Sequence, residues 1–193
     1  MISFSPLSPL FGIETPDVDL SRPLSDADFR VLEQAFYSHQ VLALRGQRVT
    51  AAQFTGFARR IGPPQPHVID QFHHPEDPDI LILSNVKKNG QPTGLQDAGS
   101  YFHTDYSYLA VPARATTLYS RVVPKVGGDT LFANQMAAYD DLPEAMKRRI
   151  EPLLAIHHYC NRNDVDKSSR TAASVLSAEQ ETTTPLFSRP LCN

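Results

Sequence analysis

The chain lacks tryptophan altogether and has only two cysteines, Cys160 and Cys192. Two cysteines outside any C-x-x-C spacing cannot build a disulfide framework, so a reduced, cytoplasmic protein is expected. No Lys/Arg-rich run forms a basic patch, and the net charge of −3 argues against binding to nucleic acid. No apolar run is long enough to span a membrane, and residues 1–11 do not resemble a signal peptide.

The length and composition are those of an ordinary globular protein. A chain of 193 residues suits one domain with a substantial core, and hydrophobic residues make up 41% of it. We therefore predict a single domain over residues 1–193. The composition is also compatible with a homo-oligomer.

Three helices are predicted from local start and stop signals. Ser25 suits the N-cap of a helix that continues to about residue 39. Thr50 and Gln53 form a capping-box pattern at the start of a second helix, which Gly62 and the following prolines end. Pro143 suits the first turn of a third helix that reaches about residue 150.

Short apolar, β-branched and aromatic runs predict the strands. They lie at residues 41–45, 80–86, 102–108, 116–123, 130–133 and 153–159. Asn89-Gly90 is a turn signal, in a stretch that suggests a loop longer than a two-residue hairpin. Residues 161–180 are polar and suggest a loop with a short helix. This order of elements predicts an α+β fold with a β-sandwich at its centre.

The first candidate for chemistry is the pair His103 and Asp105. Residues two apart on an extended segment share one face, so the imidazole and the carboxylate are expected on the same wall. They are two of the three ligands in the 2-His-1-carboxylate triad that binds Fe(II) and leaves positions open for substrate and oxygen. By itself the pair is also typical of a histidine hydrogen-bonded to a nearby aspartate.

The second candidate is the turn Gly127-Gly128-Asp129-Thr130. A double glycine frees the backbone for a sharp turn, and the hydroxyl of Thr130 is able to hydrogen-bond a carboxylate. Taken alone, the pattern is more typical of a loop before a strand-starting threonine than of a binding site.

Together these segments resemble the taurine/2,4-dichlorophenoxyacetate (TauD/TfdA) family of Fe(II)- and 2-oxoglutarate-dependent dioxygenases. The resemblance keeps a consistent order from about residue 10 to residue 180. The segments that carry it are residues 18–24, 41–47, 57–63, 83–90, 102–108, 112, 123–132 and 137–143.

The resemblance implies a double-stranded β-helix, a distorted jelly roll, with the N-terminal helices packed outside it. It implies that His103 and Asp105 are iron ligands and that Thr130 contacts 2-oxoglutarate. The implied reaction hydroxylates a small organic carboxylate or sulfonate with O2 and releases succinate and CO2. His67, Asn85 and Tyr106 are the candidates for binding the substrate.

The sequence also departs from this family. Family members continue with strands that supply a distal His ligand and an Arg for the 5-carboxylate of 2-oxoglutarate. Residues 184–190 resemble a degraded start of that region, and neither the His nor the Arg has a counterpart. We therefore expect a truncated or frameshifted member, or a fragment of one, with a jelly roll that is incomplete at its C-terminus.

Several substitutes and rival functions stay open. His157 and His158 lie on a predicted strand, so one of them is a candidate third ligand, although a histidine without a metal role fits better. His73 and His74 are expected in a solvated loop, and Arg114 and Arg121 on strand surfaces. The alternative to a dioxygenase is a catalytically inactive remnant with residual metal or partner binding. A further alternative is an interaction module in which the His-x-Asp pair is incidental.

Overall fold

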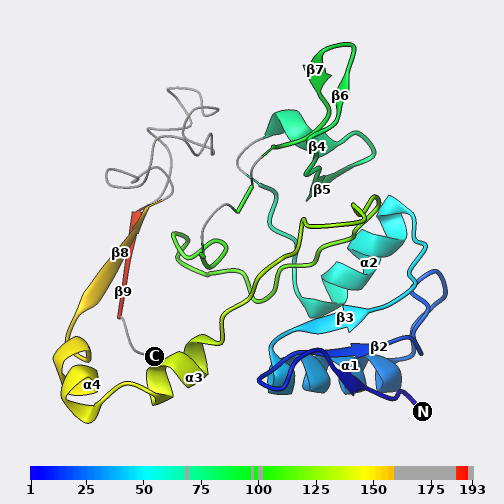
Figure 1. The fold of residues 1–193 in the computed structure, drawn as a ribbon. Coiled ribbons are helices and arrows are strands. Elements are labelled where there is room, and N and C mark those ends of the chain that lie inside the picture. Colours follow the sequence, from blue (N-terminus) through cyan, green and yellow to red (C-terminus); the bar gives the residue numbers. More distant parts are fainter. Residues whose placement is uncertain (68–69, 97, 100–101, 159–185, 191–193) are drawn as a thin grey trace. The chain divides into compact units, whose positions relative to one another are not determined.

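The computed structural model describes residues 1–67, 70–96, 98–99, 102–158 and 186–190 (Figure 1). Its contacts divide the chain into two compact units. The N-terminal unit comprises Met1–Pro64 with Tyr119–Arg121, and the C-terminal unit comprises Gln65–Leu118 with Val122–Asn193. Each unit is described by itself. The single domain predicted over the whole chain stays a prediction.

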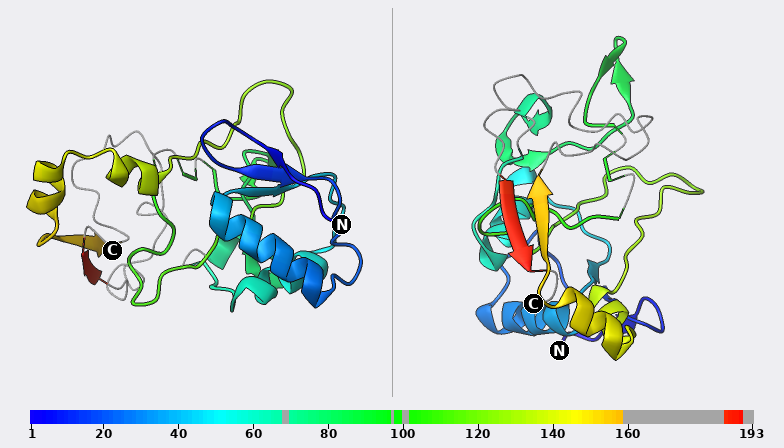
Figure 2. Two further views of the ribbon diagram at one scale, coloured as in Figure 1. Left: turned by 90° about the horizontal axis from the view of Figure 1, so that it is seen from below. Right: turned by 90° about the vertical axis from the view of Figure 1, so that its left-hand side faces the viewer.

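The N-terminal unit is built on a three-stranded sheet. β1 (Ser5–Pro6) pairs antiparallel with β2 (Ile13–Thr15), and β2 pairs parallel with β3 (Leu42–Leu44). Parallel neighbours need a crossover, and α1 (Asp26–His39) supplies it while running beside the sheet (Figure 1 and Figure 2). The predicted strand at residues 41–45 is confirmed.

Both predicted N-terminal helices are confirmed, with their caps. The Ser25 hydroxyl accepts the backbone N–H of Asp28 at 3.0 Å at the start of α1. In α2 (Ala51–Ile61), Thr50 accepts the N–H of Gln53 while the Gln53 side chain accepts the N–H of Thr50. This reciprocal pair is a complete capping box.

The core of this unit lies between the helices and the sheet. Phe29 of α1 meets Phe57 of α2 edge to face, with ring centroids 6.2 Å apart. The guanidinium of Arg60 stacks over Phe29 at 4.3 Å and donates to the carbonyl oxygen of Leu24 at 2.6 Å. Further side chains that are almost completely buried in this unit are Ile13, Thr15, Val18, Leu32 and Thr55.

The C-terminal unit contains short paired strands and two short helices. After the 3-10 turn η1 (Asp70–Phe72), β4 (His73–His74) pairs antiparallel with β5 (Asp77–Leu81). β8 (Leu154–His158) pairs antiparallel with β9 (Leu186–Pro190). The helices are α3 (Gln135–Asp140), which was not predicted, and α4 (Glu144–Ile150), which was.

The hairpin at residues 87–92 corrects one prediction. β6 (Lys87–Lys88) and β7 (Gln91–Pro92) are joined by only Asn89 and Gly90, not by a longer loop. Both linking residues have positive φ, 52° and 78°, as a type I′ turn requires. The Asn-Gly signal therefore set a tight hairpin.

Three predicted strands are wrong. Residues 102–108 form an irregular segment and a turn, and residues 116–123 and 130–133 are irregular throughout. β-branched and aromatic residues favour a strand only where a partner strand accepts their backbone hydrogen bonds. Among the described residues no strand pairs with these three segments. The strands predicted at 80–86 and 153–159 are confirmed in part, as β5 and β8.

The mixture of helices and strands confirms the α+β class. The strands within the described ranges form four small sheets, and none of these closes into a sandwich or barrel. The jelly-roll arrangement is therefore not visible in this part of the chain. None of the described helices has the length and apolar character needed to cross a membrane. The predicted loop and helix at residues 161–180 lie outside the described residues.

Candidate metal and substrate site

The side chains of His103 and Asp105 converge. His103 Nε2 lies 3.2 Å from Asp105 Oδ1, and both side chains are 39% exposed. The other carboxylate oxygen, Oδ2, accepts a hydrogen bond from the Thr116 hydroxyl at 2.6 Å. The two oxygens of Asp105 therefore have different partners.

The pair lies where an irregular segment, residues 102–104, runs into a turn at residues 105–108, and not on a strand. Tyr106 has a φ of 55°, in the left-handed region that non-glycine residues seldom adopt. The N–H of Leu109 donates to the Tyr106 carbonyl oxygen at 3.0 Å and closes the turn. The prediction that His103 and Asp105 face one way is thus met, but the alternation along a strand on which it rested is absent.

The distance between the two ligand atoms suits a divalent metal ion. Neighbouring ligands at right angles on an ion with bonds of about 2.1 Å lie about 3.0 Å apart. The 3.2 Å between Nε2 and Oδ1 is close to that separation. His103 and Asp105 therefore fit two adjacent coordination positions. Within the described ranges, no group of three or more His, Cys, Asp or Glu side chains is placed to hold a metal ion.

Tyr106 and His67 lie together beside Asp105. Their rings meet edge to face at 6.3 Å, and the Tyr106 hydroxyl donates to the Gln65 carbonyl oxygen at 3.1 Å. Burial, together with the negative charge of Asp105, raises the pKa of Tyr106 to about 12. Burial also lowers the pKa of His67, the neighbouring His73 lowers it too, and Asp105 partly offsets both. His67 is therefore a neutral hydrogen-bonding group at neutral pH.

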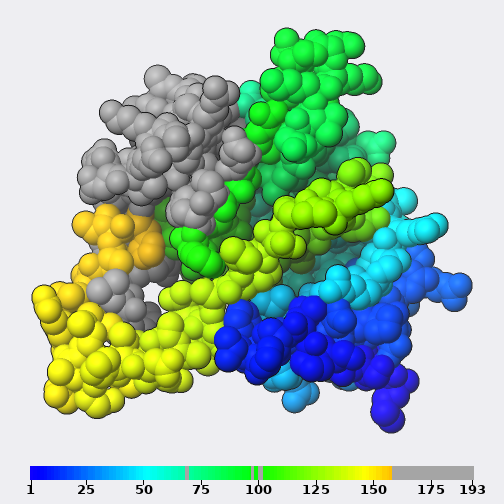
Figure 3. Space-filling view, viewed as in Figure 1, coloured from blue at the N-terminus to red at the C-terminus, as the bar shows by residue number. Residues whose placement is uncertain are grey.

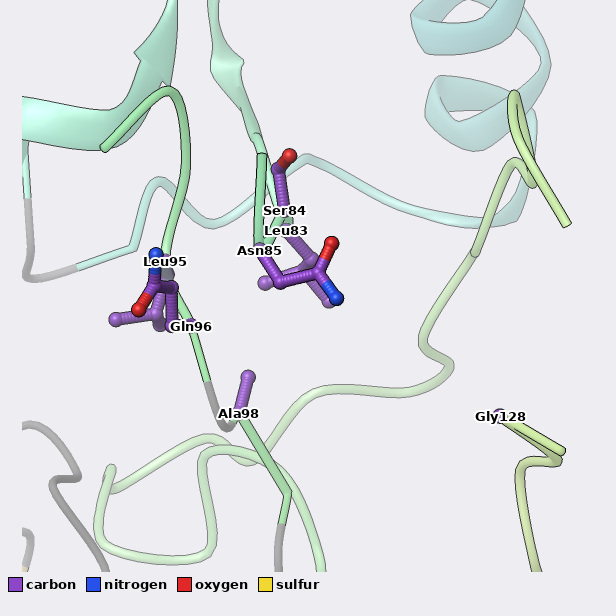
Figure 4. A pocket seen from close by; sticks show the side chains of 7 residues that line it. All are labelled: Leu83, Ser84, Asn85, Leu95, Gln96, Ala98 and Gly128. Carbon is purple, nitrogen blue, oxygen red and sulfur yellow. The ribbon is translucent and has the colours of Figure 1, made fainter. Parts of the chain in front are cut away.

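Asn85 lines a separate open pocket of the same unit, with a volume of about 390 Å³ (Figure 4). Figure 4 shows its amide pointing into this space, which also borders Gly128. The remaining lining residues are neutral: Leu83, Ser84, Leu95, Gln96 and Ala98. The pocket therefore offers hydrogen bonds and apolar contact without a formal charge among the described lining residues.

One glycine allows the walls of this pocket to approach each other. A Cβ built on Gly94 lies 2.7 Å from the Ile82 carbonyl oxygen and 2.8 Å from the Ser84 Cβ. The same close approach lets Leu95 N–H donate to Ile82 at 2.8 Å and Ser84 N–H donate to Leu95 at 3.0 Å. Gly94 therefore sets the position from which Asn85 reaches into the pocket.

Thr130 lies in the same unit as the histidine–aspartate pair. It is exposed in an irregular segment after Gly127 and Gly128, whose φ values are 75° and 76°. Among the described residues its hydroxyl makes no hydrogen bond with His103 or Asp105. Its predicted contact with 2-oxoglutarate stays a prediction.

The other candidates are spread over the same unit. His73 Nε2 lies 2.9 Å from the His67 carbonyl oxygen, on β4 and not in the predicted loop. His157 Nδ1 lies 3.0 Å from the Ser107 hydroxyl, one residue beyond Tyr106. The side chain of His158 lies outside the described part of the structure.

The two candidate arginines belong to different units. Arg114 is exposed, and Arg121 belongs to the N-terminal unit, where it stacks on Tyr119 at 5.8 Å.

Thr116 is the residue that the sequence analysis missed. It belongs to a run that was read as a strand, and 11 positions separate it from Asp105. No local pattern links the two residues, because the contact depends on the path of the chain between them.

Comparison with known proteins identifies the family to which this sequence is similar. A family model described as taurine catabolism dioxygenase TauD, TfdA family, matches residues 3–192. The chain is 34% identical over 167 residues to an alpha-ketoglutarate-dependent 2,4-dichlorophenoxyacetate dioxygenase of Cupriavidus pinatubonensis, covering 81% of this chain and 58% of that protein. It is 31% identical over 154 residues to an alpha-ketoglutarate-dependent sulfate ester dioxygenase of Pseudomonas putida, covering 79% and 48%. The chain thus spans about half the length of these relatives.

A solved structure supports the same fold. The crystal structure of AAD-2 in complex with Mn(II) and N-oxalylglycine matches with a TM-score of 0.68 at 23% identity. The match covers 99% of this chain and 64% of that chain. At this identity the likeness concerns the fold alone.

Proposed function

Because this chain belongs to the TauD/TfdA family of dioxygenases, we propose that it works in an Fe(II)- and 2-oxoglutarate-dependent oxygenase. The proposed reaction hydroxylates a small organic carboxylate, sulfonate or sulfate ester, with succinate and CO2 as co-products. Alpha-ketoglutarate, which is 2-oxoglutarate, appears in the names of relatives that act on aryloxyacetates and on sulfate esters. The strands would then belong to a double-stranded β-helix.

The observation that carries the proposal is the 3.2 Å approach of His103 Nε2 to Asp105 Oδ1. In this proposal the two atoms hold Fe(II), which when bound supplies the activation of O2. Asp105 contributes the negative charge and His103 a neutral nitrogen, a donor set suited to Fe(II) that leaves other positions free for the co-substrate.

We assign the substrate to the neutral groups around this pair. His67 and Tyr106 lie beside Asp105, and both are uncharged near neutral pH, His67 because burial lowers its pKa and Tyr106 as a phenol whose pKa is raised to about 12. They are suited to hydrogen bonds and to excluding water. Asn85 supplies an amide from the neighbouring pocket. Thr130 is retained as the proposed contact for a carboxylate of 2-oxoglutarate.

The second candidate is a catalytically inactive remnant that retains weak metal or partner binding. Its support is that the described residues bring only two protein ligands together. An ion held by two protein ligands is anchored less firmly than one held by three. We therefore expect slow or undetectable turnover from the isolated 193-residue chain.

The test is oxygen-dependent succinate formation. The purified chain is loaded with Fe(II) under nitrogen, supplied with 2-oxoglutarate and candidate aryloxyacetates or sulfate esters, and then exposed to oxygen. Succinate that is lost in Asp105→Ala but kept in Asp141→Ala, which removes an exposed carboxylate at the end of α3, supports the dioxygenase.

The other outcomes separate the two candidates. Iron that binds through His103 and Asp105 without succinate release favours the remnant. Iron binding that stays unchanged when His103 or Asp105 is substituted contradicts the proposed site.

A further inference from the structure

The carboxylate of Asp105 is held from both sides. Its Oδ1 faces His103 Nε2 at 3.2 Å, and its Oδ2 accepts the Thr116 hydroxyl at 2.6 Å. An O–H···O⁻ bond of about 2.5–2.7 Å is a strong, charge-assisted one. Thr116 therefore fixes the rotation of the carboxylate about its last bond, which a lone aspartate leaves free.

This arrangement matters for any ion bound at Oδ1. Metal-ligating carboxylates are themselves hydrogen-bonded, and these partners fix the orientation of the ligand. With Oδ2 occupied by a hydroxyl, Asp105 presents one oxygen and not two. One coordination position that a bidentate carboxylate would fill then stays open for a second ligand.

We propose that Thr116 is a positioning residue for the metal ligand Asp105, holding it in single-oxygen coordination. This inference rests on the proposed function, since it takes Asp105 to be a metal ligand. In this proposal Thr116 acts through Asp105, the residue to which its hydroxyl donates.

The neighbouring threonine provides a matched control. Thr117 follows directly in the chain, and among the described residues its hydroxyl makes no hydrogen bond to Asp105. Thr116→Val and Thr117→Val remove the same atom from adjacent positions with little change in volume. Thr116→Ser keeps the hydroxyl and removes only the methyl group.

The experiment measures Mn(II) binding to the full 193-residue chain by electron paramagnetic resonance, which reports the free ion. Melting temperatures are recorded for every variant to detect a general loss of structure. We expect Thr116→Val to weaken Mn(II) binding by about ten- to a hundredfold, the usual cost of removing such a partner. Thr116→Ser is expected to restore binding, Thr117→Val to leave it unchanged, and His103→Ala to abolish it.

The absorption spectrum of bound Co(II) provides a second measurement, which would not change if Thr116 only stabilised the fold. The visible absorption of bound Co(II) reports its coordination, so Thr116→Val at saturating Co(II) is expected to shift the bands while Thr117→Val does not. Binding and spectra that are unchanged in Thr116→Val but lost in His103→Ala overturn the role of Thr116 and leave the proposed function standing. Binding that His103→Ala and Asp105→Ala do not weaken, or no binding at all, overturns the metal site itself.

Discussion

The two units of the chain differ in how much apolar surface they bury. In the N-terminal unit, Ile13, Val18, Phe29 and Leu32 are buried, each exposing at most 8% of its surface, and two capped helices pack on a sheet. In the C-terminal unit, Tyr108 is the one apolar side chain among the described residues that reaches this level. The candidate site lies entirely in the second unit.

Exposed apolar side chains mark the C-terminal unit. Between residues 122 and 132 they are Val122, Val123, Val126, Leu131 and Phe132, each at least half exposed. The yellow-green atoms of this stretch lie on the face seen in Figure 3. Irregular segments free ligand-bearing side chains from packing, so functional groups concentrate on them. The comparison teaches that here the stable packing and the candidate chemistry occupy different parts of the chain.

The largest expected effect tests burial directly. Leu32→Ala removes a side chain that is 1% exposed and should lower the free energy of unfolding by about 2–5 kcal/mol. Leu131→Ala makes the same change at a residue that is 73% exposed and should cost at most about 0.5 kcal/mol. Urea denaturation followed by circular dichroism measures both. Equal losses of free energy of unfolding in the two variants would contradict the difference in burial between the units.

The second prediction compares a glycine-to-alanine substitution at two positions. We expect it to change the free energy of unfolding in opposite directions. Gly94→Ala forces a Cβ to within 2.7 Å of the Ile82 carbonyl oxygen and should destabilise the chain by about 1–3 kcal/mol. Gly56→Ala, within α2, places a Cβ with no neighbour within 4 Å and should stabilise by about 0.5–1 kcal/mol. The same denaturation experiment applies. Stabilisation by Gly94→Ala would show that the two pocket walls do not approach as described.

The third prediction tests the N-cap of α2 in the N-terminal unit. Thr50→Ala removes the hydroxyl that accepts the Gln53 N–H and should cost about 1 kcal/mol. Thr50→Ser keeps that hydroxyl and serves as the control, with a much smaller loss expected. Helix content from circular dichroism and the urea midpoint are the measurements. A loss of the same size in Thr50→Ser would mean that the methyl group, not the cap, is responsible.

The last prediction leaves the stability at neutral pH unchanged and concerns alkaline pH in the C-terminal unit. The pKa of Tyr106, raised to about 12, exceeds the value of about 10 expected in the unfolded chain. The folded state therefore holds the proton more tightly, so the stability from this group is complete below pH 10 and is lost as pH rises towards 12.

The tyrosinate absorbance of the parent minus that of Tyr106→Phe isolates this titration among the seven tyrosines. The same difference measured in denaturant supplies the control, with a midpoint near pH 10. A midpoint near 10 in the folded protein as well would contradict the burial of Tyr106.

The sequence predicted well where one short segment supplies all the interactions. Ser25 and Thr50 cap helices through residues three positions away, and Asn89-Gly90 sets a turn through its own backbone angles. It failed at residues 102–108 and 116–123, because strand formation depends on a partner that is distant in the chain. His103 and Asp105 were found by their spacing, although a different backbone conformation brings them together.

The sequence by itself thus determined the capped helices, the α+β character, the two candidate ligands and the family. The tertiary structure alone decided that Thr116 holds Asp105, that His67 lies against Tyr106 and that Gly94 sets the pocket beside Asn85. The physical reason is the range of the interactions. Caps and turns close within a few residues. These contacts join residues 10 to 39 positions apart and exist only once the chain between them has followed its path.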